Sequence, residues 1–166
     1  MPLLPLPHSA GCLVCSRENP HGLHLDLFAN TDATPEAIQT TFMPDAHHIG
    51  FVGVVHGGVL ATIADEVLVW SAIWSSRRAC LAGELSIRFR RKLTVGEKVK
   101  VIATVTRARP RLIESECTLA TTDGQLIAIA SGKYVPLSVD DTNDFLLTLD
   151  RLPASVAAHQ HLRSLP

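Results

Sequence analysis

The sequence predicts an α+β domain in which one long helix packs against an antiparallel β-sheet. Residues 57–75 contain no proline and have the apolar character of a buried helix. The segments around them alternate apolar and polar side chains or are rich in β-branched residues, as strands are. Short turn signals separate the last three segments, which is typical of hairpin-linked antiparallel strands. A sheet with one long helix is the α+β arrangement.

Two strands are expected before the helix. Residues 22–29 alternate and place Leu23, Leu25 and Leu27 on one face. Residues 37–43 form a second strand that pairs with the first. The helix that follows spans about 28 Å at about 1.5 Å per residue.

Four strands are expected after the helix. Residues 80–92 alternate and place charged and polar side chains on one face, which we expect to be wet: Glu84, Ser86, Arg88 and Arg90. The opposite face carries Leu81, Leu85, Ile87 and Phe89. The next three strands are residues 97–107, 111–121 and 125–136, with turns at Arg109-Pro110 and Asp123-Gly124.

The chain of 166 residues has the length of one domain. We expect this domain to span residues 1–137 and to include a Cys-x-x-Cys turn at residues 11–21. Residues 138–166 are interpreted as a partly helical tail, with one short helix ending at Leu149 and another starting at Pro153. We detect no internal repeat and no second domain.

The charge balance argues against several classes of partner. The 15 Lys and Arg against 16 Asp and Glu leave a net charge of −1, so the attraction behind unspecific binding to nucleic acid or anionic membranes is missing. The apolar stretch 51–74 contains His56, Asp65 and Glu66, which a bilayer would penalise. The amino-terminal segment lacks a basic region and contains three prolines, so we expect no signal peptide. We therefore expect a cytoplasmic protein whose four cysteines are reduced.

The helix carries two faces of different character. At 100° per residue its larger side chains form one stripe, expected to lie on the sheet: Val59, Leu60, Ile63, Val67, Trp70 and Trp74. Asp65 points the opposite way, on a face shared with small and apolar residues, namely Ala61, Ala64, Leu68 and Ala72. We expect another subunit to cover this second face, whose alanines would permit two helices to approach closely.

Asp65 is the leading candidate for a catalytic group. A carboxylate on an apolar face has a strong need for hydrogen bonds. Such surroundings suit a general base or a nucleophile. The alternative is a solvent-exposed helix residue, the commoner situation for Asp. The apolar neighbours favour the catalytic role, and Glu66 is interpreted as a rim residue.

The segment His56-Gly57-Gly58 places two glycines at the start of the helix. Unpaired backbone N–H groups and the positive end of the helix dipole meet there, and glycine lets a ligand oxygen approach the backbone. Such a terminus can polarise a carbonyl and stabilise the oxyanion that forms on attack. Simple helix capping explains the glycines equally well.

Asp65 lies eight residues beyond Gly57, about 12 Å along the helix axis, too far for both to act on one carbonyl. Two helices paired antiparallel about a twofold axis would bring Asp65 of one subunit to the Gly57 end of the other. We therefore expect a homodimer with two sites, and a dimer of dimers is a further possibility.

With HGGVLATIADE on a long helix between strands, the chain resembles the hotdog-fold acyl-CoA thioesterases, and among them the phenylacetate-degradation (PaaI-like) type. The amino-terminal C-x-x-C…N-P-x-G-L pattern and the strand LSIRFRRKLTVGE are also similar to that family, so the resemblance covers residues 11–136. It implies hydrolysis of a fatty or aromatic acyl-CoA, with Asp65 as the catalytic carboxylate and no metal or other cofactor. It further implies that Gly57 and Gly58 are carbonyl donors and that His56 lines the site.

Two positions depart from the family pattern. Relatives often carry Asn or Gln where this chain has Gly50, and Ser or Thr where it has Ala82. We expect both positions to line the substrate site. Compensation for these departures could come from His47, His48 or Glu84, and His48 is retained as a substrate-binding candidate.

Two further groups of residues have alternative interpretations. The basic residues Arg88, Arg90, Arg91 and Lys92 suit the phosphates of coenzyme A, or form a solvated sheet face. A zinc site could be built from Cys12, Cys15, His21 and His24, but the spacing favours two small buried cysteines in a turn, and no metal is expected.

Two rival functions remain open on the same fold. A hydroxyacyl dehydratase or hydratase would need a histidine and an acid in one pocket, and Asn19-Pro20-His21 only faintly resembles its motif. A non-catalytic acyl-CoA-binding module would be consistent with Gly50 and Ala82.

Overall fold

A seven-stranded antiparallel sheet forms the body of the computed structural model, which describes residues 3–164. The strand order is β1-β2-β3-β7-β8-β9-β6, and every neighbouring pair is antiparallel. The strands are β1 (Leu4–Pro5), β2 (Phe28–Asn30), β3 (Ala37–Phe42), β6 (Cys80–Phe89), β7 (Val99–Arg109), β8 (Leu112–Thr121) and β9 (Leu126–Pro136). A small hairpin of β4 (Ile49–Phe51) and β5 (Val54–Val55) follows the 3-10 turn η1 (Ala46–His48). The predicted α+β class is confirmed.

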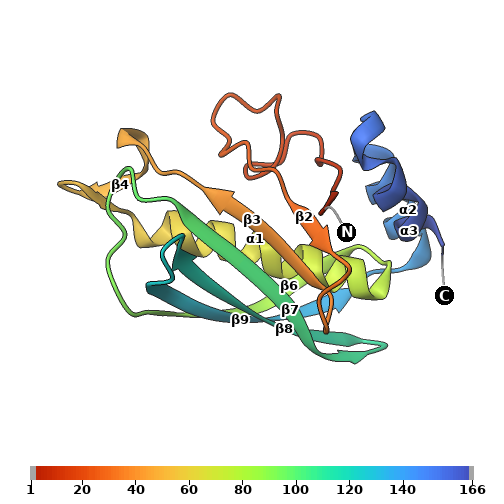
Figure 1. Ribbon diagram of the computed structural model, residues 1–166. Helices are drawn as coiled ribbons and strands as arrows, with labels where there is room; N and C mark the ends of the chain where they lie inside the picture. Colours follow the sequence, from red (N-terminus) through yellow and green to blue (C-terminus); the bar gives the residue numbers. More distant parts are fainter. Residues whose placement is uncertain (1–2, 165–166) are drawn as a thin grey trace.

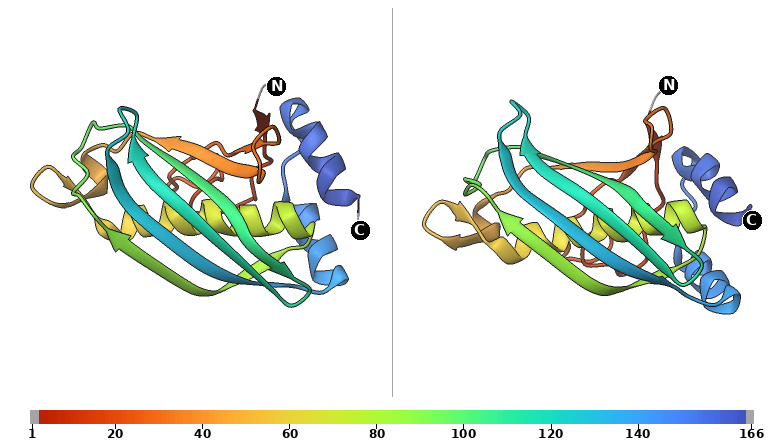
Figure 2. Two further views of the ribbon diagram at one scale, coloured as in Figure 1. Left: turned by 60° about the horizontal axis from the view of Figure 1, so that its bottom comes forward. Right: turned by 90° about the horizontal axis from the view of Figure 1, so that it is seen from below.

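The long helix α1 (Gly57–Ser76) lies along one face of this sheet, as all views show (Figures 1 and 2). His56 caps its start with a side chain that accepts the Gly58 N–H, and Arg77 ends it in the left-handed region with φ of 54°. By length and composition α1 could cross a membrane, but it contacts strands β3 and β6 to β9 of its own chain. It is therefore a core helix, as the acidic residues within it predict.

The three strands at the end of the predicted sheet are confirmed. Strands β7, β8 and β9 are joined by turns at the predicted positions, and Gly124 in the second turn has φ of 89°, a conformation that glycine adopts without strain. Inward residues alternate along β8 and β9, so one face of the sheet meets the helix while the other faces outward.

The first predicted strand is wrong for most of its length. Of residues 22–29 only Phe28 and Ala29 pair in the sheet, as part of β2, which ends at Asn30. His24 has φ of 52°, and the N–H groups of Leu23 and Leu25 bond to carbonyls of Leu13 and Val14. The segment is extended, but it pairs with the amino-terminal turn because that turn supplies its hydrogen-bond acceptors.

The predicted rotation of the helix about its own axis, which decides the side chains that face the sheet, is also wrong. Asp65, predicted to point away from the sheet, accepts a hydrogen bond from Tyr134 of β9. Trp70 and Trp74, predicted to meet the sheet, instead contact the carboxy-terminal segment through Phe145 and His161. Ala64, Leu68 and Ala72, on the same side of the helix as Asp65, are fully buried. These small residues let the helix approach its own sheet, so no second subunit is needed to cover them.

The chain's two terminal segments cover the opposite side of α1 (Figure 1). The carboxy-terminal helices are α2 (Val139–Thr148), the 3-10 turn η2 (Pro153–Ser155) and α3 (Val156–Arg163), close to the predicted limits. Ser138 caps α2 by accepting the Asp141 N–H. These helices lie at the end of α1 far from the β4–β5 hairpin (Figure 2). The domain limit at residue 137 stays a prediction.

Candidate functional site

Asp65 is held by one tyrosine from the sheet. The Tyr134 hydroxyl donates to Asp65 Oδ1 over 2.9 Å, and Tyr134 is fully buried while Asp65 is half-buried. Burial, and next the adjacent Asp65 carboxylate, raise the pKa of Tyr134, so the phenol keeps its proton and serves as a donor. The carboxylate is therefore oriented by a neutral partner and keeps one oxygen for other contacts.

Tyr134 was not found from the sequence. Its pocket depends on Gly132, two positions earlier on the same face of β9, where a Cβ would lie 2.5 Å from the tyrosine ring. The available signal was the run of small inward residues Ala128, Ala130 and Gly132 before the only tyrosine of the chain. Small residues leave room for a large side chain to lie back over them.

The start of α1 offers one free backbone donor rather than two. His56 Nδ1 accepts the Gly58 N–H over 2.8 Å, so that group is already paired. Within residues 3–164 the Gly57 N–H has no hydrogen-bond partner. The Phe89 ring lies close to Gly57, since a Cβ there would be 3.2 Å from Phe89 Cζ. Gly57 thus presents an unpaired amide beside the end of β6.

A large groove of about 950 Å³ lies next to this helix start. It is lined on one side by His48, His56 and Gly58, and on the other by residues 20–25 of the amino-terminal segment. His48 lies edge-on to Phe42 and its Nδ1 accepts the Asp45 N–H. Gly50 packs on His56, where a Cβ would be 3.2 Å from the His56 Cα. Asp65 does not line this groove.

The basic cluster is divided between two roles. Arg91 forms an ion pair with Glu97 at 2.7 Å and donates a hydrogen bond to Gln125. Its side chain therefore connects the segments before β7 and β9. Arg88 and Arg90 are exposed, and Arg90, Arg91 and Lys92 line a second hollow of about 340 Å³ together with Gly57 and Phe89. The strand ends at Phe89, so strict alternation no longer separates these residues.

Strand β6 is a free edge of the sheet. Among the described residues it pairs with β9 alone, and it exposes three large apolar side chains, those of Leu81, Leu85 and Phe89. Ala82 stands opposite Tyr134 in the register and is exposed. Cys80 at one end of β6 lies near Ser76 and Phe89 at the other end lies near Gly57, so β6 runs alongside α1 in the opposite direction.

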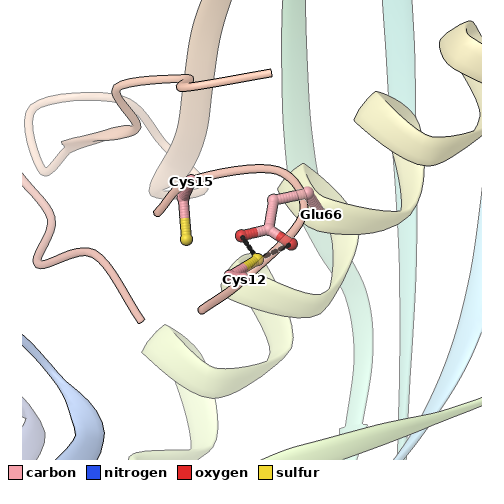
Figure 3. A group of neighbouring side chains, drawn as sticks. All are labelled: Cys12, Cys15 and Glu66. Carbon is pink, nitrogen blue, oxygen red and sulfur yellow. Dashed lines mark hydrogen bonds between the residues drawn. The ribbon is translucent and has the colours of Figure 1, made fainter. Parts of the chain in front are cut away.

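A second cluster of reactive groups lies on the other side of α1, next to Asp65 in sequence. Cys12, Cys15 and Glu66 place their ligand atoms within 4.8 Å of one another (Figure 3). The burial of Glu66 raises its pKa to about 7. The sequence interpretation of Glu66 as a rim residue is wrong, because the amino-terminal turn folds over it.

Comparisons with known proteins agree with this architecture. A family model described as "Thioesterase superfamily" matches residues 52–128, which include α1 and Asp65. A search of curated proteins found no match.

Three solved structures illustrate the likeness. A thioesterase superfamily protein is 26% identical with a TM-score of 0.68, and the match covers 75% of this chain and 60% of that protein. The Escherichia coli PaaI protein from the phenylacetic acid degradation operon is 20% identical with a TM-score of 0.58, covering 61% and 73%. A hypothetical thioesterase from Streptococcus pneumoniae, solved with coenzyme A, is 13% identical with a TM-score of 0.56, covering 61% and 79%. The chain thus spans 60%, less than two thirds, of the length of the first of these proteins.

Proposed function

We propose that the chain hydrolyses an acyl-CoA thioester to the free acid and coenzyme A, because a thioesterase superfamily model matches residues 52–128 and a thioesterase superfamily protein shares its fold. The observation that carries this proposal is the pairing of two features on α1. One is a half-buried carboxylate oriented by a buried tyrosine, and the other is a free amide at the helix start. The PaaI-like neighbour agrees in fold with the resemblance found in the sequence.

In the proposed reaction the thioester carbonyl oxygen accepts the Gly57 N–H at the start of α1. The helix dipole adds positive potential there, so the oxyanion that develops on attack is stabilised. His56 keeps its capping role and forms part of the wall, because its ring is committed to the Gly58 N–H. Gly58 becomes a second donor only when the His56 ring turns away.

Asp65 activates the attacking group in one of two ways that the residues leave open. As a general base it takes a proton from water while the water oxygen attacks the carbonyl carbon. The tetrahedral intermediate then expels the coenzyme A thiolate, which takes up that proton. As a nucleophile Asp65 attacks the carbonyl carbon, the C–S bond breaks and the coenzyme A thiolate leaves. Water then hydrolyses the resulting acyl anhydride, which releases the free acid, restores the Asp65 carboxylate and supplies the proton that the thiolate takes up. Neither route requires a cofactor.

The two halves of the site are proposed to come from two subunits. Asp65 and Gly57 are eight residues apart, about 12 Å along α1. The free edge β6 runs alongside α1, from Cys80 near Ser76 to Phe89 near Gly57. Antiparallel pairing of two β6 edges would also set the two α1 helices antiparallel, so that the Gly57 end of one subunit approaches Asp65 of the partner subunit. A homodimer, or a dimer of dimers, follows from this pairing and replaces the pairing through bare helix faces.

The coenzyme A moiety is proposed to lie over the basic hollow beside Gly57. Arg90 and Lys92 are exposed in this hollow and can meet its phosphates, whereas Arg91 stays with Glu97. Arg88 is exposed on β6, outside the lining of the hollow. The groove beside His48 and Gly50 is proposed to accept the remaining part of the substrate. The cytoplasmic location stays a prediction.

The test is thiol release from a panel of short, long and aromatic acyl-CoAs by wild-type protein and Asp65→Asn. We expect Asp65→Asn to fold normally and to lower kcat by about 100-fold or more, the scale of losing a general base. Glu116→Gln, which removes an exposed carboxylate on the outer face of β8, serves as the matched control and should match wild type.

Three outcomes would contradict the proposal. Folded Asp65→Asn protein that keeps full turnover would remove Asp65 from the chemistry. Hydration of crotonyl-CoA without thiol release would identify a hydratase. Tight binding of every acyl-CoA without any turnover would identify a binding module.

A further inference from the structure

The cluster of Cys12, Cys15 and Glu66 is assembled from two distant parts of the chain. The cysteines belong to the amino-terminal turn, and Glu66 lies in the middle of α1 (Figure 3). Cys15 is fully buried, and Cys12 and Glu66 are partly buried. The thioester chemistry proposed above uses none of the three, so their proximity calls for a separate explanation.

The distances within the cluster match those around a small tetrahedral ion. Cys12 Sγ lies 3.7 and 3.8 Å from the two carboxylate oxygens of Glu66, and all three ligand atoms fit within 4.8 Å. With zinc–sulfur bonds of about 2.3 Å and zinc–oxygen bonds of about 2.0 Å, tetrahedral ligands lie roughly 3.5–3.8 Å apart. Small side-chain movements would suffice to close the site around the ion.

Backbone N–H groups point at both sulfurs. The Val14 N–H donates to Cys12 Sγ over 3.3 Å, and the Ser9 N–H donates to Cys15 Sγ over 3.4 Å. Such donors favour the thiolate, which is the form that binds metal. Each of the two sulfurs would thus keep a backbone N–H donor as a thiolate ligand of a metal ion.

The carboxylate of Glu66 lacks a cationic partner. Within residues 3–164 its hydrogen bonds come from Trp70 Nε1 at 3.1 Å and from the Cys12 thiol, and it forms no ion pair. Burying a carboxylate without a counter-charge is costly. A divalent cation would offset two of the three negative charges that this carboxylate and two thiolates carry.

We propose that Cys12, Cys15 and Glu66 bind a zinc ion, with water completing the fourth position. Two thiolates and one carboxylate form a donor set of mixed softness, which suits zinc better than magnesium or calcium. The proposal departs from the expectation of no metal, which had considered His21 and His24 as the partners of the cysteines. His24 is committed to the Ser16 carbonyl at 2.8 Å, and His21 is exposed.

The ion would fasten the amino-terminal segment to the helix that carries Asp65. Leu13, between the two cysteines, lines the large groove together with residues 20–25. Binding zinc would therefore fix one wall of that groove. The ion would take no part in thioester hydrolysis, since the site lies on the side of α1 away from Tyr134.

The experiment measures metal in the full chain purified without chelators. We expect about one zinc per chain by elemental mass spectrometry, and a sulfur-to-cobalt charge-transfer band after replacement of zinc by Co²⁺. Cys12→Ser and Cys15→Ser should lose both signals. Glu66→Gln, which can still accept the Trp70 N–H, should bind Co²⁺ at least about 10-fold more weakly, since even an outer-shell loss has that effect.

Cys80→Ser is the matched control, because Cys80 is also buried but lies near Ser76, outside the cluster. It should keep the wild-type metal content. A chelator should lower the melting temperature of wild type and leave that of Cys12→Ser unchanged. The proposal is overturned if reduced wild type takes up no zinc, if either cysteine variant keeps it, or if Cys12 and Cys15 are found as a disulfide in freshly isolated protein.

Discussion

Two adjacent carboxylates on α1, Asp65 and Glu66, have different surroundings. Asp65 faces the sheet, where a buried tyrosine hydroxyl orients it and leaves it half-exposed. Glu66 faces the amino-terminal turn, where it accepts hydrogen bonds from the Cys12 thiol and from the indole N–H of Trp70 on its own helix. Adjacent helical residues point about 100° apart, so one step along the chain changes the wall that a side chain meets. Neighbouring residues of like charge can therefore take separate roles.

The largest effect is expected when Asp65 loses the hydroxyl of Tyr134, which donates a hydrogen bond to it. Tyr134→Phe deletes a hydrogen bond to a charged group, worth about 1.5–3 kcal/mol. We expect kcat to fall roughly 10- to 100-fold with KM unchanged, because the phenol positions Asp65 without touching substrate. Steady-state kinetics with one acyl-CoA measures both constants. A rise in KM at constant kcat would contradict the positioning role, and metal content should remain that of wild type.

A second variant on the sheet side of α1 tests how tightly the ring of Tyr134 is packed. The new methyl in Gly132→Ala would lie 2.5 Å from the Tyr134 ring, so we expect a loss of about 1–3 kcal/mol in unfolding free energy. Urea denaturation measures it. Gly83→Ala is the control, since its methyl would meet only ordinary contacts starting at 3.4 Å. Equal stability losses in the two variants would show that Tyr134 is not tightly held.

Removing the indole donor tests the opposite side. Trp70→Phe deletes the N–H that Glu66 accepts and should lower the unfolding free energy by about 1–2 kcal/mol. Trp74→Phe is the matched control, because its N–H bonds to the exposed Glu36 and should contribute less. We expect kcat to fall less in Trp70→Phe than in Tyr134→Phe. The reverse order would mean that the two sides of α1 are not separable.

The smallest effect is expected at the basic hollow beside Gly57. Arg90→Ala should raise KM for acyl-CoA up to about 5-fold, the scale of an exposed ion pair. KM for the corresponding N-acetylcysteamine thioester, which lacks the phosphates, should not change. Arg111→Ala, in a turn remote from the hollow, is the control. An equal rise for both substrates would place Arg90 outside the coenzyme A site.

Local patterns predicted the parts of the fold that depend on local interactions. The proline-free apolar run became α1, and Asp123-Gly124 became a turn because glycine accepts the positive φ there. The Cys-x-x-Cys turn was recognised, but its third member was not. Glu66 is 51 residues beyond Cys15, and no spacing rule relates a turn to the middle of a later helix.

The site was predicted in part for the same reason. Asp65 was selected by its apolar neighbours, and Gly57 by its place at a helix start. Tyr134 was missed, since only the register of β9 against β6 and β8 brings it beneath Asp65. Gly58 was assigned as a free donor, but its N–H donates to the ring of His56. The orientation of that ring cannot be predicted from the neighbouring residues in the sequence.

The sequence by itself determined that one helix follows His56, that hairpins follow it, and that Asp65 and Glu66 point in different directions. Only the tertiary structure decided which of the two meets the sheet. Helical periodicity fixes the angle between side chains, but the rotation of the helix about its own axis depends on everything that packs around it. Here the sheet fits the small residues and the terminal segments cover the tryptophans, which turned the predicted arrangement around.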